Sequence, residues 1–137
     1  MTTFAPLRGL TAAALLAVGL TGAACATVQR SGPTDAELLA QLPADEAGVI
    51  VHNSRVATGT YSIHLTEGTG VEEPLGLVGT GEAVLIRIPE PASSRPVRLI
   101  ARSPSAPQVA SDAIQFTGGR GAVSWDLRTN QVRRLRQ

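Results

Sequence analysis

The sequence has no lysine, a single cysteine and very few aromatic residues: one Trp, one Tyr and two Phe. A single cysteine cannot form an intramolecular disulfide, so the fold depends on burial without a covalent cross-link. So few rings also argue against an exposed aromatic platform for stacking sugars or bases. The formal net charge is +1. Because nucleic-acid-binding domains are strongly basic, we expect no nucleic-acid partner.

The chain also lacks a long apolar run. Residues 9–20 are apolar and uncharged, but a membrane-spanning helix needs about 20 such residues. This run follows Arg8 and precedes the small residues TGAACA, which is the order of regions in a secretory signal. We therefore expect residues 1–24 to be a signal peptide that exports the chain.

Two cleavage sites are open around Cys25. The end of the segment, Ala23-Ala24-Cys25, resembles a bacterial lipoprotein signal, in which the cysteine is acylated and becomes the first residue; Gly22 stands where leucine is usual. Cleavage after Ala26 would instead release a soluble periplasmic or secreted protein. A free thiol is a liability in an oxidising compartment, which favours lipid attachment at Cys25. We expect a lipoprotein of the outer membrane or another periplasm-facing membrane.

Residues 25–47 are polar and predict a tether. Within it, Thr34 and Glu37 have capping-box spacing, and Pro43 ends the apolar run that follows. This pattern predicts a short helix over residues 35–42. A spacer without structure is the other interpretation.

From residue 48 to the C-terminus, apolar and polar residues alternate with period two, which is typical of half-buried strands. We expect strands at 48–53, 60–66, 74–78, 82–88, 96–103, 109–117, 122–129 and in the last residues. This spacing predicts an all-β fold, a small antiparallel β-sandwich of about seven strands over residues 48–137. The expected core comprises Val49, Val51, Tyr61, Ile63, Leu65, Leu75, Leu77, Val84, Ile86, Ile88, Val97, Leu99, Ile114, Phe116, Val123, Trp125 and Leu127.

Residues 48–128 resemble a class of small, uncharacterised bacterial exported proteins that pair a lipoprotein-like leader with one β-sandwich. The resemblance lies in VIVHNSRVATGTYSIHL, PLGLVGTGEAVLIRIP, VRLIARSPSAP and VSWDL. It implies an immunoglobulin-like or transthyretin-like fold and no particular activity.

Charge is unevenly distributed along the chain. Residues 25–91 hold nine acidic residues and three arginines, whereas residues 92–137 hold two acidic residues and eight arginines. We expect the two parts to interleave in the sandwich and compensate each other. A basic C-terminal strand with Arg133, Arg134 and Arg136, facing phosphate-rich lipid or polysaccharide, is the alternative.

Two candidate binding sites follow from the pattern. His52 and His64 lie on strands expected to be neighbours, and imidazole pairs bind Zn²⁺ or Cu²⁺, although no spacing supplies a third ligand. Arg87, Arg98 and Arg102 are expected on one outer sheet face, where they could bind an anion. The simpler interpretation of both sets is a solvated strand surface.

No catalytic pattern stands out. The motif G-x-S-x-G is absent, Ser124 and Asp126 read as outward-facing strand residues, and the adjacent Glu72 and Glu73 would point apart. We therefore expect no enzymatic activity and no cofactor. The sequence predicts an accessory lipoprotein of the cell envelope whose sandwich is a structural or protein-interaction module, held to the membrane by its lipid and bound to an unknown envelope protein. A ligand-binding module is the alternative.

Overall fold

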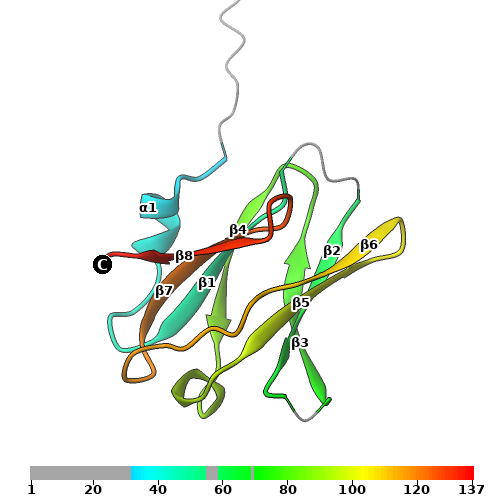
Figure 1. The fold of residues 1–137 in the computed structure, drawn as a ribbon. Coiled ribbons are helices and arrows are strands. Elements are labelled where there is room, and N and C mark those ends of the chain that lie inside the picture. The colour runs from blue at the N-terminus through cyan, green and yellow to red at the C-terminus, as the bar shows by residue number, and fades with distance from the viewer. Residues whose placement is uncertain (1–31, 55–58, 69) are drawn as a thin grey trace, which may run out of the picture.

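The computed structural model describes residues 32–54, 59–68 and 70–137. The predicted signal peptide, Cys25 and the first part of the tether lie outside these residues. Eight strands and a short helix make up the described part (Figure 1). Their bounds are α1 Asp35–Leu39, β1 Ala47–His52, β2 Tyr61–Thr66, β3 Glu72–Val78, β4 Ala83–Ile88, β5 Arg98–Ser103, β6 Ala106–Ala110, β7 Gly121–Asp126 and β8 Gln131–Leu135, with a 3₁₀ turn at Ala92–Ser94. No helix in these ranges is long and apolar enough to cross a membrane.

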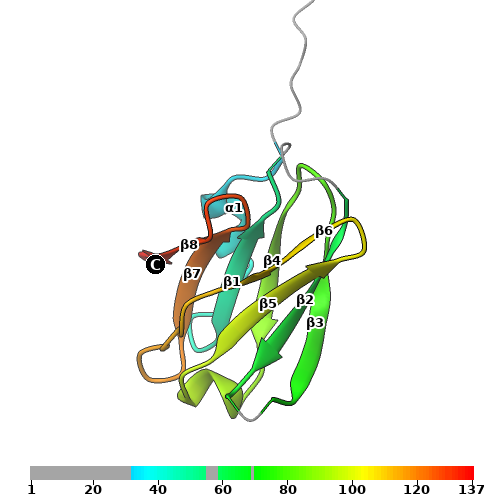
Figure 2. The same ribbon diagram turned by 45° about the vertical axis from the view of Figure 1, so that its right-hand side comes forward.

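The strands form two four-stranded sheets that face each other as a β-sandwich (Figure 2). Sheet A has the order β4-β1-β7-β8, and sheet B has the order β3-β2-β5-β6. Every pairing is antiparallel except that of β1 with β7, which is parallel. The predicted all-β sandwich is therefore confirmed. The prediction that all strands are antiparallel is wrong for the two central strands of sheet A, β1 and β7.

The core lies between the sheets and is built from side chains of both. Trp125, Val49 and Val51 of sheet A and Ile63 and Leu99 of sheet B are fully buried there. The inward-facing residues predicted from alternation are in the core with few exceptions: Leu75 and Val84 pack against it half-buried, and Leu77 is 66% exposed.

The exposure of Leu77 has a local cause in β3. The register between β2 and β3 shifts between Ile63 and His64, where β3 contributes one extra residue. Val78 pairs with Tyr61 and is buried, so its neighbour Leu77, which pairs with Ser62, faces outward. A bulge of this kind breaks the period of two, and the prediction that Leu77 is a core residue is wrong for that reason.

The predicted strand over residues 109–117 is also wrong. The strand at this point, β6, ends at Ala110. Beyond it, the Ser111 hydroxyl accepts a hydrogen bond from the Leu99 amide at 2.9 Å, and Ile114 forms only an isolated bridge with Val97. A side chain thus replaces a backbone partner, so the ladder stops although the segment stays close to β5.

Helix α1 packs on the outer face of sheet A. Its capping box is complete: the Thr34 hydroxyl accepts from the Glu37 amide, and the Glu37 carboxylate accepts from the Thr34 amide at 2.7 Å. Leu38 and Leu42 are buried. A Cβ built on Gly48 of β1 would lie 3.0 Å from Leu42, so this glycine gives the helix segment room to approach the strand. The predicted helix is therefore present, shorter than expected and docked.

Candidate functional site

The two histidines occupy opposite sides of the sandwich. His52 lies on β1 in sheet A and His64 on β2 in sheet B, and neither strand pairs with the other. Both side chains alternate with core residues, so each faces away from the core on its own sheet. The expectation that their strands are neighbours is wrong, and the structure does not bring the two imidazoles together.

The three arginines of the expected anion face are separated in the same way. Arg87 belongs to β4 in sheet A, whereas Arg98 and Arg102 belong to β5 in sheet B. Arg87 lies 3.5 Å from the Glu46 carboxylate, and Arg102 lies 2.6 Å from that of Glu72. Two of these cations therefore already have acidic partners, and the three do not form one face.

Ion pairs link the acidic and the basic parts of the chain, as expected. Arg102 pairs with Glu72, and Arg95 pairs with Glu67 at 3.2 Å. Both arginines come from the later, basic part and both glutamates from the earlier, acidic part. At the C-terminal strand, Arg134 donates to Thr117 Oγ1 and to the Gln115 carbonyl.

Among the described residues, one Ser–His contact lies on the outer face of sheet B. His64 Nε2 lies 3.0 Å from Ser62 Oγ, two residues away on the same strand. The Ser62 hydroxyl also lies 3.3 Å from the Arg102 carbonyl, to which it donates. Within the described residues, no carboxylate bonds the other ring nitrogen, and neither residue lines one of the main pockets. The contact therefore lacks the orienting group and substrate space that nucleophilic catalysis requires.

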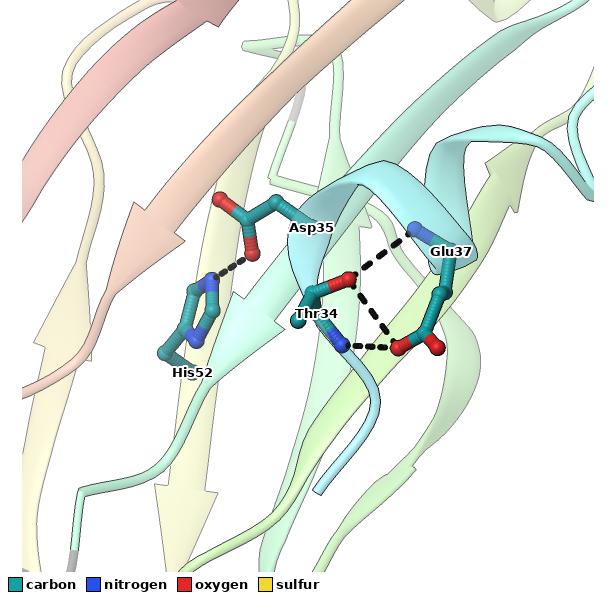
Figure 3. Close-up of polar contacts among 4 residues, drawn as sticks. All are labelled: Thr34, Asp35, Glu37 and His52. Atoms are coloured by element: carbon teal, nitrogen blue, oxygen red, sulfur yellow. Dashed lines mark hydrogen bonds and ion pairs between the residues drawn. The ribbon is translucent and has the colours of Figure 1, made fainter. Parts of the chain in front are cut away.

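His52 is in a different setting, at the end of β1 where α1 begins. His52 Nε2 lies 2.8 Å from Asp35 Oδ1 (Figure 3), although the ring N–H is not aligned with this oxygen as a hydrogen bond. Asp126 is the Cα partner of His52 on the parallel strand β7. Three distant segments of the chain thus meet at this end of sheet A.

A pocket of about 340 Å³ opens beside His52 where the chain enters α1, and we call it the entry pocket. Its walls come from the approach to α1, the ends of β1 and β7, and the turn between β3 and β4. The lining residues are Gly32, Pro33, Thr34, Asp35, His52, Asn53, Ser54, Gly81, Glu82, Ala83 and Asp126.

The entry pocket is acidic. Asp35, Glu82 and Asp126 line it, and neither arginine nor lysine does among its described lining residues. Each carboxylate has one oxygen engaged: Asp126 Oδ1 accepts from the Arg128 amide at 2.8 Å, and Glu82 Oε2 accepts from the Gly79 amide at 2.8 Å. The remaining carboxylate oxygens have no partner in the part of the chain that the structure describes.

The same walls contain unusual buried polar atoms. Four buried side-chain nitrogen or oxygen atoms in the described residues lack an aligned hydrogen bond, and three of them belong to residues that line this pocket: His52 Nε2, Asn53 Oδ1 and Ser54 Oγ. His52 Nε2 is already in contact with Asp35 at 2.8 Å, which leaves Asn53 Oδ1 and Ser54 Oγ without a polar contact in the described chain. Native proteins leave few such groups unpaired, and each one calls for an explanation such as a bound polar group.

A second hollow, of about 430 Å³, lies at the opposite end of β1. Its charged residues include Arg87 and Glu46, which pair with each other. Asp45 and Glu90 line it too, so two acidic residues remain beyond the neutralised pair and this hollow is acidic as well. The fourth unpaired atom, Ser93 Oγ, belongs to it.

Comparison with known proteins adds no candidate site: no protein-family model, curated protein or solved structure matches this chain significantly. The entry pocket was not predicted from the sequence, because its three carboxylates come from residues 35, 82 and 126. The available signals were indirect. Asp35 opens a capped helix, and Asp126 precedes the turn that leads into β8.

Proposed function

We propose that this chain is an exported accessory lipoprotein of the cell envelope, anchored through Cys25, whose β-sandwich binds another envelope protein and does not catalyse a reaction. The leader-like order of residues 1–24 and the position of Cys25 support the anchor. The observation that carries the proposal is the docked helix. Because α1 is fixed on sheet A, the segment after the predicted anchor joins the sandwich at a rigid point.

A fixed attachment point matters for a tethered binding domain. The helix segment docks on sheet A through Leu38 and Leu42. The outer face of sheet B therefore stays uncovered in the described structure. A partner can therefore approach surfaces that the attachment does not use. The lack of an oriented nucleophile–base pair in the described residues supports a binding role over an enzymatic one.

For the fold type, we propose the transthyretin-like alternative. In an immunoglobulin-like sandwich the first, second, fifth and fourth strands share one sheet, so strands one and two are neighbours. Here β1 and β2 belong to different sheets, and β1 lies between β4 and β7. Two sheets of four strands each are compatible with a transthyretin-like sandwich.

The anchor is tested by growing cells that express the full chain with radiolabelled palmitate. We expect the label on the wild-type protein and its loss in Cys25→Ala, because only a cysteine at this position accepts the lipid. His52→Ala is the matched control, since it alters the folded domain and should retain the label. Equal labelling of Cys25→Ala and wild type would refute the anchor.

A further inference from the structure

We propose that β8, at the edge of sheet A, binds an extended acidic segment of the partner protein as an added strand. This inference rests on the proposed function, because it identifies how the partner is held. The site, which we call the β8 edge, is Gln131–Leu135 with the flanking residues Arg128 and Arg136.

β8 is a regular strand with one open side. It lies at the end of the order β4-β1-β7-β8, and within the described chain it pairs only with β7 (Figure 1). An edge strand presents a row of backbone N–H and C=O groups that have no strand partner. The pairing with β7 runs from Gln131 to Leu135 in one register without a bulge, and the sequence of the strand, QVRRL, contains no proline. Such an edge can accept a further strand through main-chain hydrogen bonds.

The other three sheet edges of the described structure carry features that hinder strand addition. β3 contains Pro74, and its pairing with β2 shifts register. β6 contains Pro107, and its pairing with β5 also shifts register. At β4, helix α1 packs against the strand and Arg87 lies 3.5 Å from the Gln41 carbonyl. Since proline, bulges and covering elements protect edges, β8 is the edge best suited to a partner strand.

Charge selects the class of segment. Arg133 and Arg136 lie on the β8 edge, Arg128 lies in the turn before it, and all three are exposed. None of them forms an ion pair within the described chain, whereas three arginines elsewhere each have a glutamate partner. Opposite charges on neighbouring strands stabilise a sheet and like charges destabilise it. The added strand is therefore expected to carry glutamate or aspartate.

The β8 edge is held in place by contacts with other segments. At its start, Asn130 Oδ1 accepts from the Trp125 indole at 3.0 Å, and the Asn130 side-chain amide donates to the Ala110 carbonyl at 2.9 Å. Further along, Arg134 donates to Thr117 Oγ1 at 3.2 Å. Because the strand is already ordered, pairing with a partner requires little further loss of its conformational entropy.

Charge and proline disfavour an occupant from this chain. A second copy that added its own β8 would place Arg133, Arg134 and Arg136 beside the same arginines. The acidic edge strand of a second copy, β3, contains Pro74, which cannot donate to a ladder. Residues 1–31 hold no acidic residue. The complementary segment is therefore assigned to another protein.

The test is an NMR titration of the full ¹⁵N-labelled chain in a neutral detergent. The probe is the acetylated and amidated peptide Thr-Glu-Val-Glu-Val-Glu-Thr. We expect it to shift the amide signals of Val132, Arg133 and Arg134, and to leave those of Gln108 and Val109 on the β6 edge unchanged. The same peptide with its internal residues N-methylated lacks the backbone donors and should bind about tenfold less tightly. Equal binding of the two peptides would overturn strand addition, as would shifts on β6 as large as those on β8.

Two charge changes locate the ligand chemistry. Replacing the glutamates of the peptide by glutamine should weaken binding about fivefold, and Arg133→Glu should weaken binding of the acidic peptide by about the same factor. Arg98→Glu is the matched control, because Arg98 is exposed on β5 of the other sheet and forms no ion pair in the described chain. Equal weakening by Arg98→Glu would show a general charge effect and refute the site.

Anionic lipid is the rival ligand for the same arginines, and glycerol phosphate, a soluble lipid headgroup, is its probe. We expect no saturable shift of the β8 signals with glycerol phosphate at the concentrations that saturate with the acidic peptide. Shifts as large as those with the peptide would assign these arginines to a membrane surface and overturn the acidic segment.

The anchor and the β8 edge are separable in these experiments. Loss of the palmitate result would remove the membrane anchor and leave the peptide titration as evidence for a strand-binding edge. Failure of the titration with palmitate labelling intact would remove the edge site and leave the anchored module.

Discussion

The two sheets of the sandwich differ in what covers their outer faces. Sheet A carries α1 on its outer side, and its central strand β1 is buried from Ala47 to Val51 without interruption. Sheet B has no such cover in the described chain, and its central strand β2 alternates strictly between buried and half-exposed residues. The two burial patterns correspond to strands covered on two faces and on one face.

This difference in cover explains what the outward-facing polar side chains of each sheet contact. On sheet B, outward-facing His64 contacts Ser62 and outward-facing Arg102 pairs with Glu72. On sheet A, the helix and the sheet enclose space between them, so His52 meets Asp35 at the edge of a pocket. The start of the docked helix thus supplies one wall of this pocket.

The largest expected effect is on the free energy of unfolding, and it compares two apolar residues on the outer faces of the sheets. Ile50 of β1 is fully buried, whereas Leu77 of β3 is 66% exposed. We expect Ile50→Ala to lower the free energy of unfolding by about 3 kcal/mol and Leu77→Ala to change it by about 0.5 kcal/mol or less. Urea unfolding of the full chain measures both. Similar losses for the two variants would mean that α1 does not protect the face of sheet A.

A smaller effect is expected from two glycines. A Cβ at Gly48 would lie 3.0–3.1 Å from methyl groups of Leu42 and Leu85, whereas one at Gly76 meets nothing closer than 3.8 Å. Gly48→Ala should destabilise the protein by about 1 kcal/mol through overpacking. Gly76→Ala should be neutral or stabilise it by about 0.5 kcal/mol, because alanine restricts the unfolded chain. Thermal unfolding distinguishes them, and a neutral Gly48→Ala would contradict close packing of the helix segment.

The smallest effect concerns pH and the start of α1. The pKa of Glu37 is lowered from 4.5, first by the hydrogen bond from the Thr34 backbone and then by that from the Thr34 side chain. Since the folded pKa is the lower one, the stabilisation is present above pH 4.5 and is lost as the pH falls through the folded value. The NMR signals of Glu37 and α1 should therefore titrate with a midpoint below pH 4.5.

Thr34→Ala sharpens this test, because it removes the side-chain hydrogen bond and keeps the backbone one. We expect the pKa of Glu37 in this variant to rise only part of the way toward 4.5. An unchanged pKa would show that the capping box does not form in solution.

Local features of the fold could be predicted from the sequence. Alternation identified the inward faces of β2, β4 and β7, and capping-box spacing identified α1. These signals are local because each depends on residues a few positions apart. The bulge in β3 and the early end of β6 could not be predicted, since each depends on a partner strand or on a side chain, such as Ser111, that replaces a backbone group.

Local sequence patterns could not predict which strands share a sheet, nor the position of the entry pocket. Adjacent strands in a sequence often pair, and this expectation placed His52 beside His64. The chain instead crosses from one sheet to the other between β1 and β2. Asp35, Glu82 and Asp126 come together only because β1 pairs with β7 and the helix returns over it. Long-range pairing of this kind leaves no short-range signal.

The parallel pairing of β1 with β7 also sets an order of assembly. Residues 47–52 form one strand, and their parallel partner is residues 121–126, near the other end of the chain. Pairings between such distant residues form slowly, because a long loop must close before the contacts stabilise it. During synthesis from the N-terminus, the centre of sheet A therefore stays incomplete until residue 126 has been added, so the sandwich closes only late.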